Sequence, residues 1–219
     1  MNTRHKSTSP STRRKLIDAS VELIRVRGFN GTTVEDICKT AGVTKGGFFH
    51  YFESKDAVAD AALATFTEAR NEIFREAPFR QVADPLERVF ARLDFEKDLI
   101  ESSGKLKGCL AGMLAQELAS SRKEYREACQ GFFASRADDL TADLAAAKAA
   151  HAPRADFDPK SLALFYLAVI QGSQILSKVS GNNEVRLESI EHLRAYLRGL
   201  FGVARPGGRG RKSGSAPKS

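Results

Sequence analysis

The segment from Thr33 to Phe52 carries hydroxyl, ammonium and imidazole groups that can hydrogen-bond to phosphates and to the edges of bases. Apolar residues recur at helical spacing on one face of its first part, namely Val34, Ile37 and Ala41. Gly42 follows, where a tight turn between two helices favours positive φ. Thr44 can cap a second helix, whose free N–H groups then point outward. The pattern predicts a helix-turn-helix whose second helix reads the major groove of DNA.

The residues after the turn make this pattern more specific. The stretch Phe48-Phe-His-Tyr-Phe-Glu-Ser-Lys-Asp56 follows Thr44-Lys-Gly, and together they closely resemble the signature of the TetR family of repressors. The resemblance covers residues 11–71, with the usual uncertainty at the boundaries. It implies an all-α protein, with an N-terminal three-helix DNA-binding domain followed by a helical bundle for effector binding and dimerisation. We therefore expect a sequence-specific transcriptional regulator, by family habit a repressor.

Carried over residue by residue, the resemblance also implies which side chains contact DNA. Lys45 would face a phosphate or a base edge at the start of the recognition helix, and Lys55 would hold a flanking phosphate. His50 would lie along the DNA face, although a merely solvated position stays open for it. Phe48 and Phe52 are expected in the core. The predicted DNA-binding residues are Arg13, Arg14, Thr33, Thr44, Lys45, Gly46, Gly47, His50, Tyr51 and Lys55.

Two residues depart from the family pattern. Gly47 stands where relatives usually carry Ser, Thr or Ala, so one hydroxyl contact is lost and the helix start is looser. Phe49 stands where Tyr is common, so a phenol contact is lost as well. We expect basic residues near the N-terminus, above all Arg13, Arg14 and Lys15, to compensate by reaching phosphate or the minor groove.

The formal net charge of +7 is concentrated at the two ends of the chain. Five basic residues and no acidic one lie in residues 1–15, and the same is true of residues 205–219. The body between these ends is therefore slightly acidic. Basic tails bind phosphates without sequence preference, so an architectural nucleic-acid binder is one alternative to a sequence-specific regulator. A purely solubilising role stays open for the C-terminal tail.

Other classes of protein are disfavoured by what the sequence lacks. The three cysteines are odd in number and widely spaced, which fits neither a disulfide framework nor a zinc site. No Ser-His-Asp ordering, HExxH motif or phosphate loop indicates an enzyme. No run of 18 apolar residues predicts a membrane helix, and the basic start lacks the apolar stretch of a signal peptide. We expect a cytoplasmic protein that holds no metal or cofactor.

Long segments with helical periodicity fill the rest of the sequence. We divide it into a flexible basic arm (1–10), a DNA-binding domain (11–71), an effector-binding and dimerisation domain (72–203) and a disordered basic tail (204–219). Thr32 with Glu35 is expected to form a capping box for the first helix of the motif, and Ser54 to cap the helix that follows the motif. The other expected helices are Ser11–Arg27, Asp56–Glu76, Pro85–Ser102, Leu106–Ala119, Lys123–Ala150, Pro159–Ser180 and Val185–Phe201.

The stretch from Lys107 to Leu118 resembles the branch of the family typified by the N-ethylmaleimide-responsive repressor. There a cysteine begins a central helix beside the pocket, and Cys109 matches it. A thiol at a helix N-terminus near Lys105 and Lys107 would favour its thiolate, and Lys178 matches a lysine near the corresponding cysteine. The resemblance implies a protein that senses electrophiles or oxidants, or that binds small organic acids, and it makes Cys109 a candidate sensor. A packing role stays open, because cysteine is often a small buried apolar residue, as we expect for Cys38 and Cys129.

A reversible small-molecule effector is the other possibility for the second domain. Its pocket would be mostly apolar with a few polar anchors, although the same residues could be plain core. The candidate pocket residues are Cys109, Met113, Leu114, Phe132, Phe133, Phe165, Tyr166, Gln171 and Gln174.

Dimerisation is expected because one recognition helix holds only half of a palindromic operator. The last two helices would pack against their copies in a four-helix interface. The small residues Gly172 and Ser173 would permit close approach there. Leucines and an isoleucine form a stripe at helical spacing, which an intramolecular core could also explain. The predicted stripe consists of Leu187, Ile190, Leu193, Leu197 and Leu200.

Overall fold

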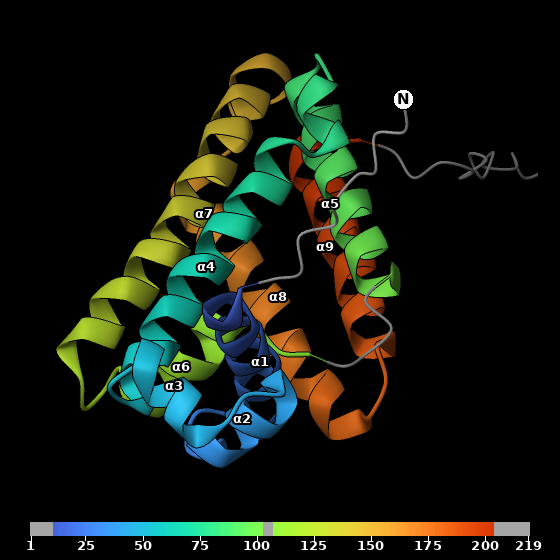
Figure 1. Ribbon diagram of the computed structural model, residues 1–219. Coiled ribbons are helices and arrows are strands. Elements are labelled where there is room, and N and C mark those ends of the chain that lie inside the picture. Colours follow the sequence, from blue (N-terminus) through green and yellow to red (C-terminus); the bar gives the residue numbers. More distant parts are fainter. Residues whose placement is uncertain (1–10, 103–106, 204–219) are drawn as a thin grey trace, which may run out of the picture.

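The computed structural model describes residues 11–102 and 107–203, and all of their regular structure is helical (Figure 1). The all-α prediction is therefore confirmed. The helices are α1 (Thr12–Arg27), α2 (Val34–Ala41), α3 (Lys45–Tyr51), α4 (Lys55–Arg75), the 3-10 helix η1 (Pro78–Gln81), α5 (Pro85–Ser102), α6 (Leu110–Leu118), α7 (Lys123–His151), α8 (Pro159–Ser180) and α9 (Glu184–Phe201). The predicted arm (1–10), the predicted tail (204–219) and Lys105 lie outside the described residues.

Polar side chains set where the helices of the N-terminal part begin. The Ser11, Thr44 and Ser54 hydroxyls accept hydrogen bonds from backbone N–H groups in the first turns of α1, α3 and α4. The capping box of α2 is formed by Thr33 with Asp36, whose side chains accept from each other's backbone N–H groups at 3.1 Å. The prediction of Thr32 with Glu35 was wrong by one residue.

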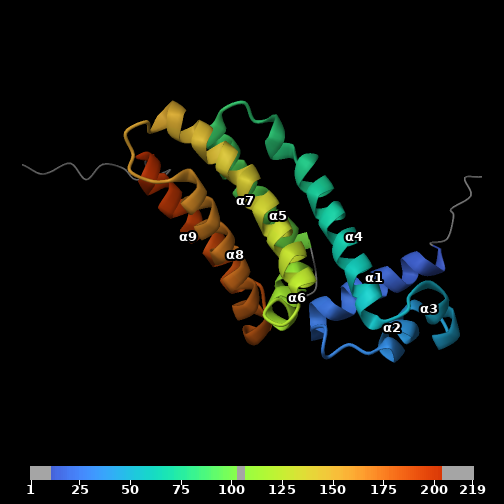
Figure 2. The same ribbon diagram turned by 90° about the vertical axis from the view of Figure 1, so that its left-hand side faces the viewer.

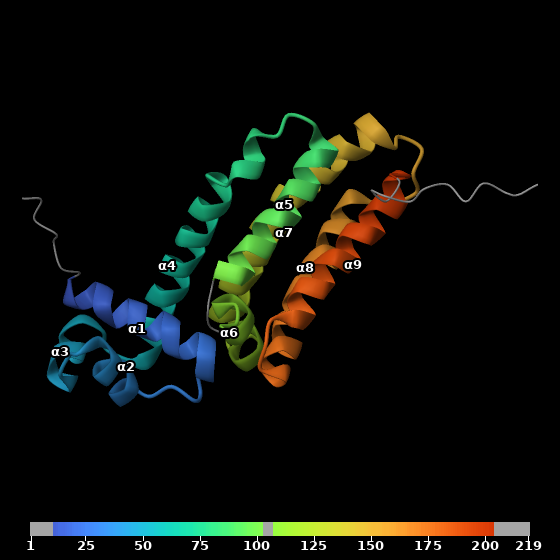
Figure 3. The same ribbon diagram turned by 90° about the vertical axis from the view of Figure 1, so that its right-hand side faces the viewer.

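The chain forms two adjoining bundles that share α7. In views from two opposite sides, α5, α7, α8 and α9 run side by side, as their mutual contacts require, while α1, α2 and α3 gather at one end beside the start of α4 (Figures 2 and 3). One core joins α5, α7, α8 and α9. The other joins α1–α4 with α6 and the first part of α7. The predicted domain boundary near residue 71 therefore falls inside α4, and the packing continues across it.

The core of the DNA-binding end includes residues from far along the sequence. Leu110, Leu114 and Tyr125 are buried among the α1–α4 side chains, with exposed fractions of 0 to 4%. Burying a large apolar side chain stabilises a fold by about 1.5–3 kcal/mol. Side chains of α6 and α7 thus complete the core on which the helix-turn-helix packs.

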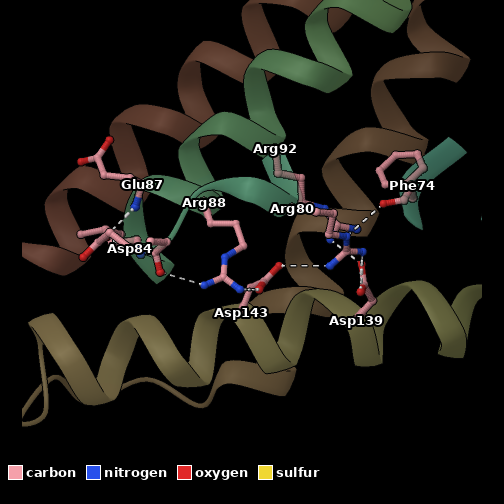
Figure 4. Close-up of polar contacts among 10 residues, drawn as sticks. Phe74, Arg80, Asp84, Glu87, Arg88, Arg92, Asp139 and Asp143 are labelled. Carbon is pink, nitrogen blue, oxygen red and sulfur yellow. Dashed lines mark hydrogen bonds and ion pairs between the residues drawn. The ribbon is translucent and has the colours of Figure 1, made fainter. Parts of the chain in front are cut away.

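Charged side chains join α7 to η1 and α5 inside the larger bundle (Figure 4). Arg92 is fully buried, and its Nη1 lies 2.7 Å from Asp139 Oδ2. Arg80 Nη2 lies 2.6 Å from both oxygens of the same carboxylate, and Arg88 lies 3.5 Å from Asp143. Burial opposes ionisation of Asp139, but Arg92 and Arg80 outweigh it and lower the pKa of this carboxyl.

We predict that Asp139→Asn destabilises the protein by about 3 kcal/mol, because the buried Arg92 loses its charge partner. Equilibrium urea unfolding measures this. Since Asp139 has a lowered pKa in the folded state, its contribution is present above the ordinary aspartate pKa of about 3.9 and is lost as the pH falls through the lowered value. The difference from wild type should therefore shrink in acid.

Glu127→Gln on the same helix is the matched control. Its partner is Lys123 at 3.5 Å, and both side chains are mostly exposed. This variant should stay within about 0.5 kcal/mol of wild type. Equal losses in the two variants would contradict the assignment of Asp139 to the buried network.

Candidate DNA-binding surface and effector cavity

The turn of the helix-turn-helix forms at Gly42. Its φ of 66° and ψ of 37° are left-handed, which glycine adopts without strain. The Val43 N–H bonds to the Cys38 carbonyl at 3.0 Å and so closes the end of α2. Phe48 and Phe52 are 0 and 5% exposed and hold α3 against the core, as predicted. The sequence predicted both the turn and the core face of the motif, because each is set by the spacing of a few neighbouring residues.

The opposite face of the motif is open to solvent. Thr33, Thr44, Lys45, Gly46, His50 and Tyr51 are exposed, and Gly47 is half-buried. The His50 and Tyr51 rings meet edge to face with centroids 4.8 Å apart. Phe49 is 50% exposed beside them, where a phenol is missing. These residues are accessible to a binding partner, and their contact with DNA stays a prediction.

Lys45 does not extend freely from this surface. Its Nζ lies 2.5 Å from Glu35 Oε1, and both side chains are more than 60% exposed. The hydrogen bond to Lys45 lowers the pKa of Glu35, and the bond to Glu35 raises the pKa of Lys45. Lys45 must therefore give up this carboxylate before it can neutralise a phosphate.

Lys55 is tied to the turn between α1 and α2. Its Nζ donates to the Phe29 and Thr32 carbonyls at 3.0 Å each and lies 4.0 Å from the centre of the Phe29 ring. Burial lowers the pKa of this ammonium. Two of its three N–H donors hold backbone, so at most one is left for the phosphate contact that the family resemblance implies.

Arg13 and Arg14 lie in the first turn of α1 and not in an extended arm. The Arg13 guanidinium lies 5.4 Å from the centre of the Phe52 ring, and Arg14 pairs with Asp18 at 2.8 Å. Both side chains are exposed beside the motif. They remain close enough to the motif to contribute phosphate contacts through helix α1 itself.

Four hydrogen bonds connect this end of the molecule to the two ends of α6. Arg25 Nε donates to the Gly108 carbonyl at 2.7 Å, and the Gly108 N–H donates back to the Arg25 carbonyl at 3.2 Å. At the other end of α6, the Glu117 carboxylate accepts from the Phe29 and Asn30 N–H groups at 3.1 and 2.7 Å. The turn that leads into the helix-turn-helix is therefore fastened to α6.

Gly28 makes the Glu117 contact possible. Its φ of 84° disfavours any residue with a Cβ, and a Cβ built there would lie 2.1 Å from Glu117 Oε1. The sequence signalled Gly28 only as a helix end, and nothing in it pointed to its distant carboxylate partner.

A cavity of about 120 Å³ opens where α1, α4, α5, α7, α8, α9 and the segment before α6 meet. Five of the predicted pocket residues line it: Cys109, Phe132, Phe133, Gln171 and Gln174. Sequence reasoning missed its most polar components, which are Arg25, Arg70, Glu96, Lys107, Arg136 and Arg186. No spacing signal could have found them, because they come from six different helices or loops.

Four predicted pocket residues lie elsewhere. Leu114 is fully buried in the core of the DNA-binding end, and Phe165 is 47% exposed on the outer face of α8. Tyr166 is buried, and burial together with Glu96 raises its pKa well above the usual value, although Arg92 opposes them. Met113 packs beside Lys178, with 3.7 Å between its sulfur and Nζ. Helical periodicity gives the buried face of a helix but not which buried residue borders a cavity.

Cys109 occupies the N-cap of α6 and lines the cavity, as predicted. Lys107, which was expected to activate it, pairs with Glu22 at 3.3 Å. Lys178 donates to the Val26 carbonyl at 3.2 Å and does not line this cavity. Arg25 is the cation that interacts with Cys109 across the cavity wall.

Two parts of the chain match known protein families. Residues 16–62 match bacterial regulatory proteins of the tetR family, and residues 85–192 match the C-terminal domain of LmrA/YxaF-like transcriptional regulators. The uncharacterized HTH-type transcriptional regulator YdgC of Bacillus subtilis is 33% identical over 145 residues, which cover 61% of this chain and 74% of YdgC. The chain belongs to the TetR family.

The HTH-type transcriptional repressor NemR of Escherichia coli is 30% identical over 124 residues. These cover 57% of this TetR-family chain and 62% of NemR, so they span less than two thirds of that relative. Reduced NemR has the same fold, with a TM-score of 0.67 and 24% identity over 85% of this chain and 96% of NemR. A TetR regulatory protein from Rhodobacter sphaeroides reaches a TM-score of 0.75 at 24% identity, covering 88% and 100% of the two chains. Both matched family models describe transcriptional regulators.

The apolar surface of this TetR-family protein differs from the predicted dimer stripe. Ile190, Leu193 and Leu197 are at most 2% exposed because they pack in the intrachain core, so that part of the prediction was wrong. Ser173 is buried as well, and Leu187 and Leu200 are half-buried. A Cβ placed on Gly172 would have no neighbour within 4 Å. Six of the exposed large apolar residues instead follow the outer face of α8 and one site on α9: Leu164, Phe165, Ile175, Leu176, Val179 and Tyr196.

The same helix is long and apolar enough to cross a membrane, judged by length and composition alone. Its most apolar window has a mean hydropathy of 1.4 and is 33% buried. The sequence still has no uninterrupted run of 18 apolar residues, and this helix meets the criterion by its mean hydropathy. A helix that packs on its own chain with one side and on a partner with the other passes the same test.

We predict that Glu35→Gln tightens DNA binding by about two- to fivefold, because it frees Lys45 and removes a negative charge from the DNA face. The slope of log affinity against log salt concentration should steepen by about one unit, as one more phosphate contact forms. Fluorescence anisotropy across a salt series measures both. Glu68→Gln makes the same charge change on exposed α4 and should alter neither quantity, whereas an unchanged slope in Glu35→Gln would contradict the role given to Lys45.

Of the three thiols, Cys109 should react first with N-ethylmaleimide in the folded protein. Cys129 is 2% exposed, and burial raises its pKa to about 11. Cys38 is 7% exposed, and burial also raises its pKa. Mass spectrometry during a labelling time course should show one fast site, absent in Cys109→Ser. A fast second site in that variant would contradict the burial argument.

Proposed function

We propose that this regulator is a cytoplasmic homodimeric repressor that leaves a palindromic operator when a small molecule enters the cavity. The observation that carries the proposal is the double position of Arg25. It lies in α1, against which α2 and α3 pack, and its side chain lines the cavity. A ligand that displaces this side chain acts on the DNA-binding end without any intermediate element.

The hydrogen bonds that Arg25 and Glu117 make at the two ends of α6 support the same coupling between the cavity and the DNA-binding end. Any ligand that shifts the start of α6 at Gly108 also shifts Glu117 at its other end, nine residues further on. Glu117 holds the N–H groups of Phe29 and Asn30, which precede α2. The cavity and the entry to the helix-turn-helix are therefore two ends of one short helix, and such an element can transmit a displacement between sites.

Repression is the direction favoured by the relatives, because NemR is named a transcriptional repressor. An electrophile or oxidant acting at Cys109 is a second candidate trigger. It is favoured by one observation: Cys109 is the least buried of the three thiols and borders the cavity. A reversible ligand and a covalent one would thus act at the same place.

The direct test is a mobility shift with the full chain and the DNA that flanks its own gene. The repressor proposal expects a discrete complex with a palindromic fragment, which competes poorly with scrambled DNA. Removal of residues 205–219 should leave this complex intact, whereas an architectural binder would lose it. Binding that ignores sequence would overturn the proposal. Adding N-ethylmaleimide to wild type and to Cys109→Ser separates the covalent trigger from the reversible one.

The dimer has its own test. Leu176 is 56% exposed in the centre of the apolar face of α8, so Leu176→Asp should place a charge in the proposed interface and yield monomers in sedimentation equilibrium. Ile73→Asp is the control, because Ile73 is 40% exposed on α4, away from that face. Loss of the dimer should also weaken operator binding, since each half-site alone is held by one helix. A wild-type monomer, or a dimeric Leu176→Asp, would refute this interface.

A further inference from the structure

The cavity beside Cys109 holds an unusual excess of positive charge. Five basic side chains line it, contributed by α1, α4, α7, α9 and the segment before α6, against the single carboxylate of Glu96. The basic residues are Arg25, Arg70, Lys107, Arg136 and Arg186. Lys107 is neutralised from outside by Glu22 at 3.3 Å. The other four are arginines, which stay charged at any physiological pH.

Glu96 cannot balance these four arginines. Its Oε1 lies 3.8 Å from Arg136 Nη2 and also 3.8 Å from Arg92 Nε, so its one charge is already shared with a buried arginine outside the cavity. Among the described residues, no carboxylate oxygen lies within 4.0 Å of the guanidinium of Arg25, Arg70 or Arg186. Glu22 attracts Arg25 and Glu96 attracts Arg186, but only from beyond ion-pair distance, so within the described part of the chain none of these three guanidiniums is paired with a carboxylate.

Burial disfavours the charged form of these arginines, and their mutual repulsion disfavours it further. Burial lowers the pKa of Arg136 to about 10, with Arg92 and Arg70 adding to the effect. It also lowers the pKa of Arg25 and of Arg186, and Arg70 again contributes to both. Arg70 is thus the shared neighbour of the group. A cluster of this kind is stabilised most directly by an anion placed between its members.

The other residues that line the cavity indicate which kind of anion would fit it. Seven aromatic and aliphatic side chains line the rest of the cavity: Phe66, Leu99, Ile100, Phe132, Phe133, Leu167 and Ile170. Gln171 and Gln174 add neutral amides. A guanidinium fork matches the two oxygens of a carboxylate, and the apolar walls match a short hydrocarbon or aromatic body. The volume of about 120 Å³ suits a small molecule.

We propose that the effector is a small organic acid whose carboxylate binds among Arg25, Arg70 and Arg186, with its apolar body against Phe132 and Phe133. This inference deepens the proposed function and depends on it for its regulatory meaning. Arg25 gives it a route to DNA release. Its Nε already holds the Gly108 carbonyl at 2.7 Å, so a carboxylate that draws the guanidinium inward pulls on α1 and on the start of α6 together.

The experiment measures thermal unfolding of the full chain with matched acids and amides: acetate, butyrate and benzoate against acetamide, butyramide and benzamide. At least one acid should raise the melting temperature in a saturable way, with a dissociation constant at least about tenfold below that of its amide. Inorganic phosphate is a further arm, since it shares the anionic chemistry but lacks the apolar body, and it should stabilise less than the best acid. Equal effects of acid and amide, no effect of any acid, or phosphate as the best ligand would each overturn the proposal.

Variants locate the binding to the cavity. Arg70→Gln and Arg186→Gln should each weaken binding of the best acid at least about tenfold, whereas Arg154→Gln, an exposed arginine outside the cavity, should not. Arg70→Lys should restore part of the affinity. Without ligand at low salt, the two glutamine variants should melt at or above the wild-type temperature because like-charge repulsion is relieved. Lower melting temperatures with retained acid binding would make the cluster structural and refute the proposal.

A mobility shift separates this inference from the function on which it rests. If the chain binds a palindromic operator and the acid binds without releasing it, the carboxylate site stands and its regulatory role fails. If no acid binds but the operator complex forms, the organic-acid proposal alone fails. If no operator complex forms with any DNA, the proposed function fails, and the thermal data still decide whether the arginine cavity binds carboxylates.

Discussion

The coupling between the two ends of this molecule depends on two hydrogen bonds between Arg25 and Gly108, one from the Arg25 side chain and one between backbone groups. They join the last turn of the first helix to the segment that begins α6, and Glu117 repeats the connection at the end of α6. Because of these two attachments, α6 is both a wall of the cavity and a support for the turn into α2. A regulator needs such a shared element, since a ligand can shift an equilibrium only through contacts that differ between two states.

The buried arginines fall into two groups that behave differently. Arg92 is fully buried but faces Asp139 and Glu96, so its charge strengthens the packing of α5 on α7. Arg70 and Arg186 face a cavity without such partners among the described residues. Residues of one type therefore stabilise the fold in one place and leave it open to a ligand in another, and the difference lies entirely in the neighbouring carboxylates.

Local features of the fold could be predicted from the sequence, and long-range ones could not. The left-handed Gly42 and the Thr44 cap depend on a few neighbouring residues, so motif spacing sufficed. Thr32 and Thr33 both have an acid three residues on, and only the three-dimensional bond from Thr32 to the Gly28 carbonyl decides which one caps α2. Periodicity showed that Leu193 is buried but not by what. No pattern in the sequence indicated the arginines of the cavity, because they come from different helices and meet only in the folded protein.

The DNA-binding end has no complete core of its own. Leu110, Leu114 and Tyr125 from α6 and α7 complete it. Attempts to build chimeric biosensors by joining the first 76 residues to another family member's second half would therefore cut through a packed interior, not between two modules. A working fusion would have to keep α6 and the first turns of α7 with their own partners, or exchange both sides of that contact together. The specificity of such regulators thus evolves under a constraint: new ligands can be recruited only by changing cavity walls that leave this shared packing intact.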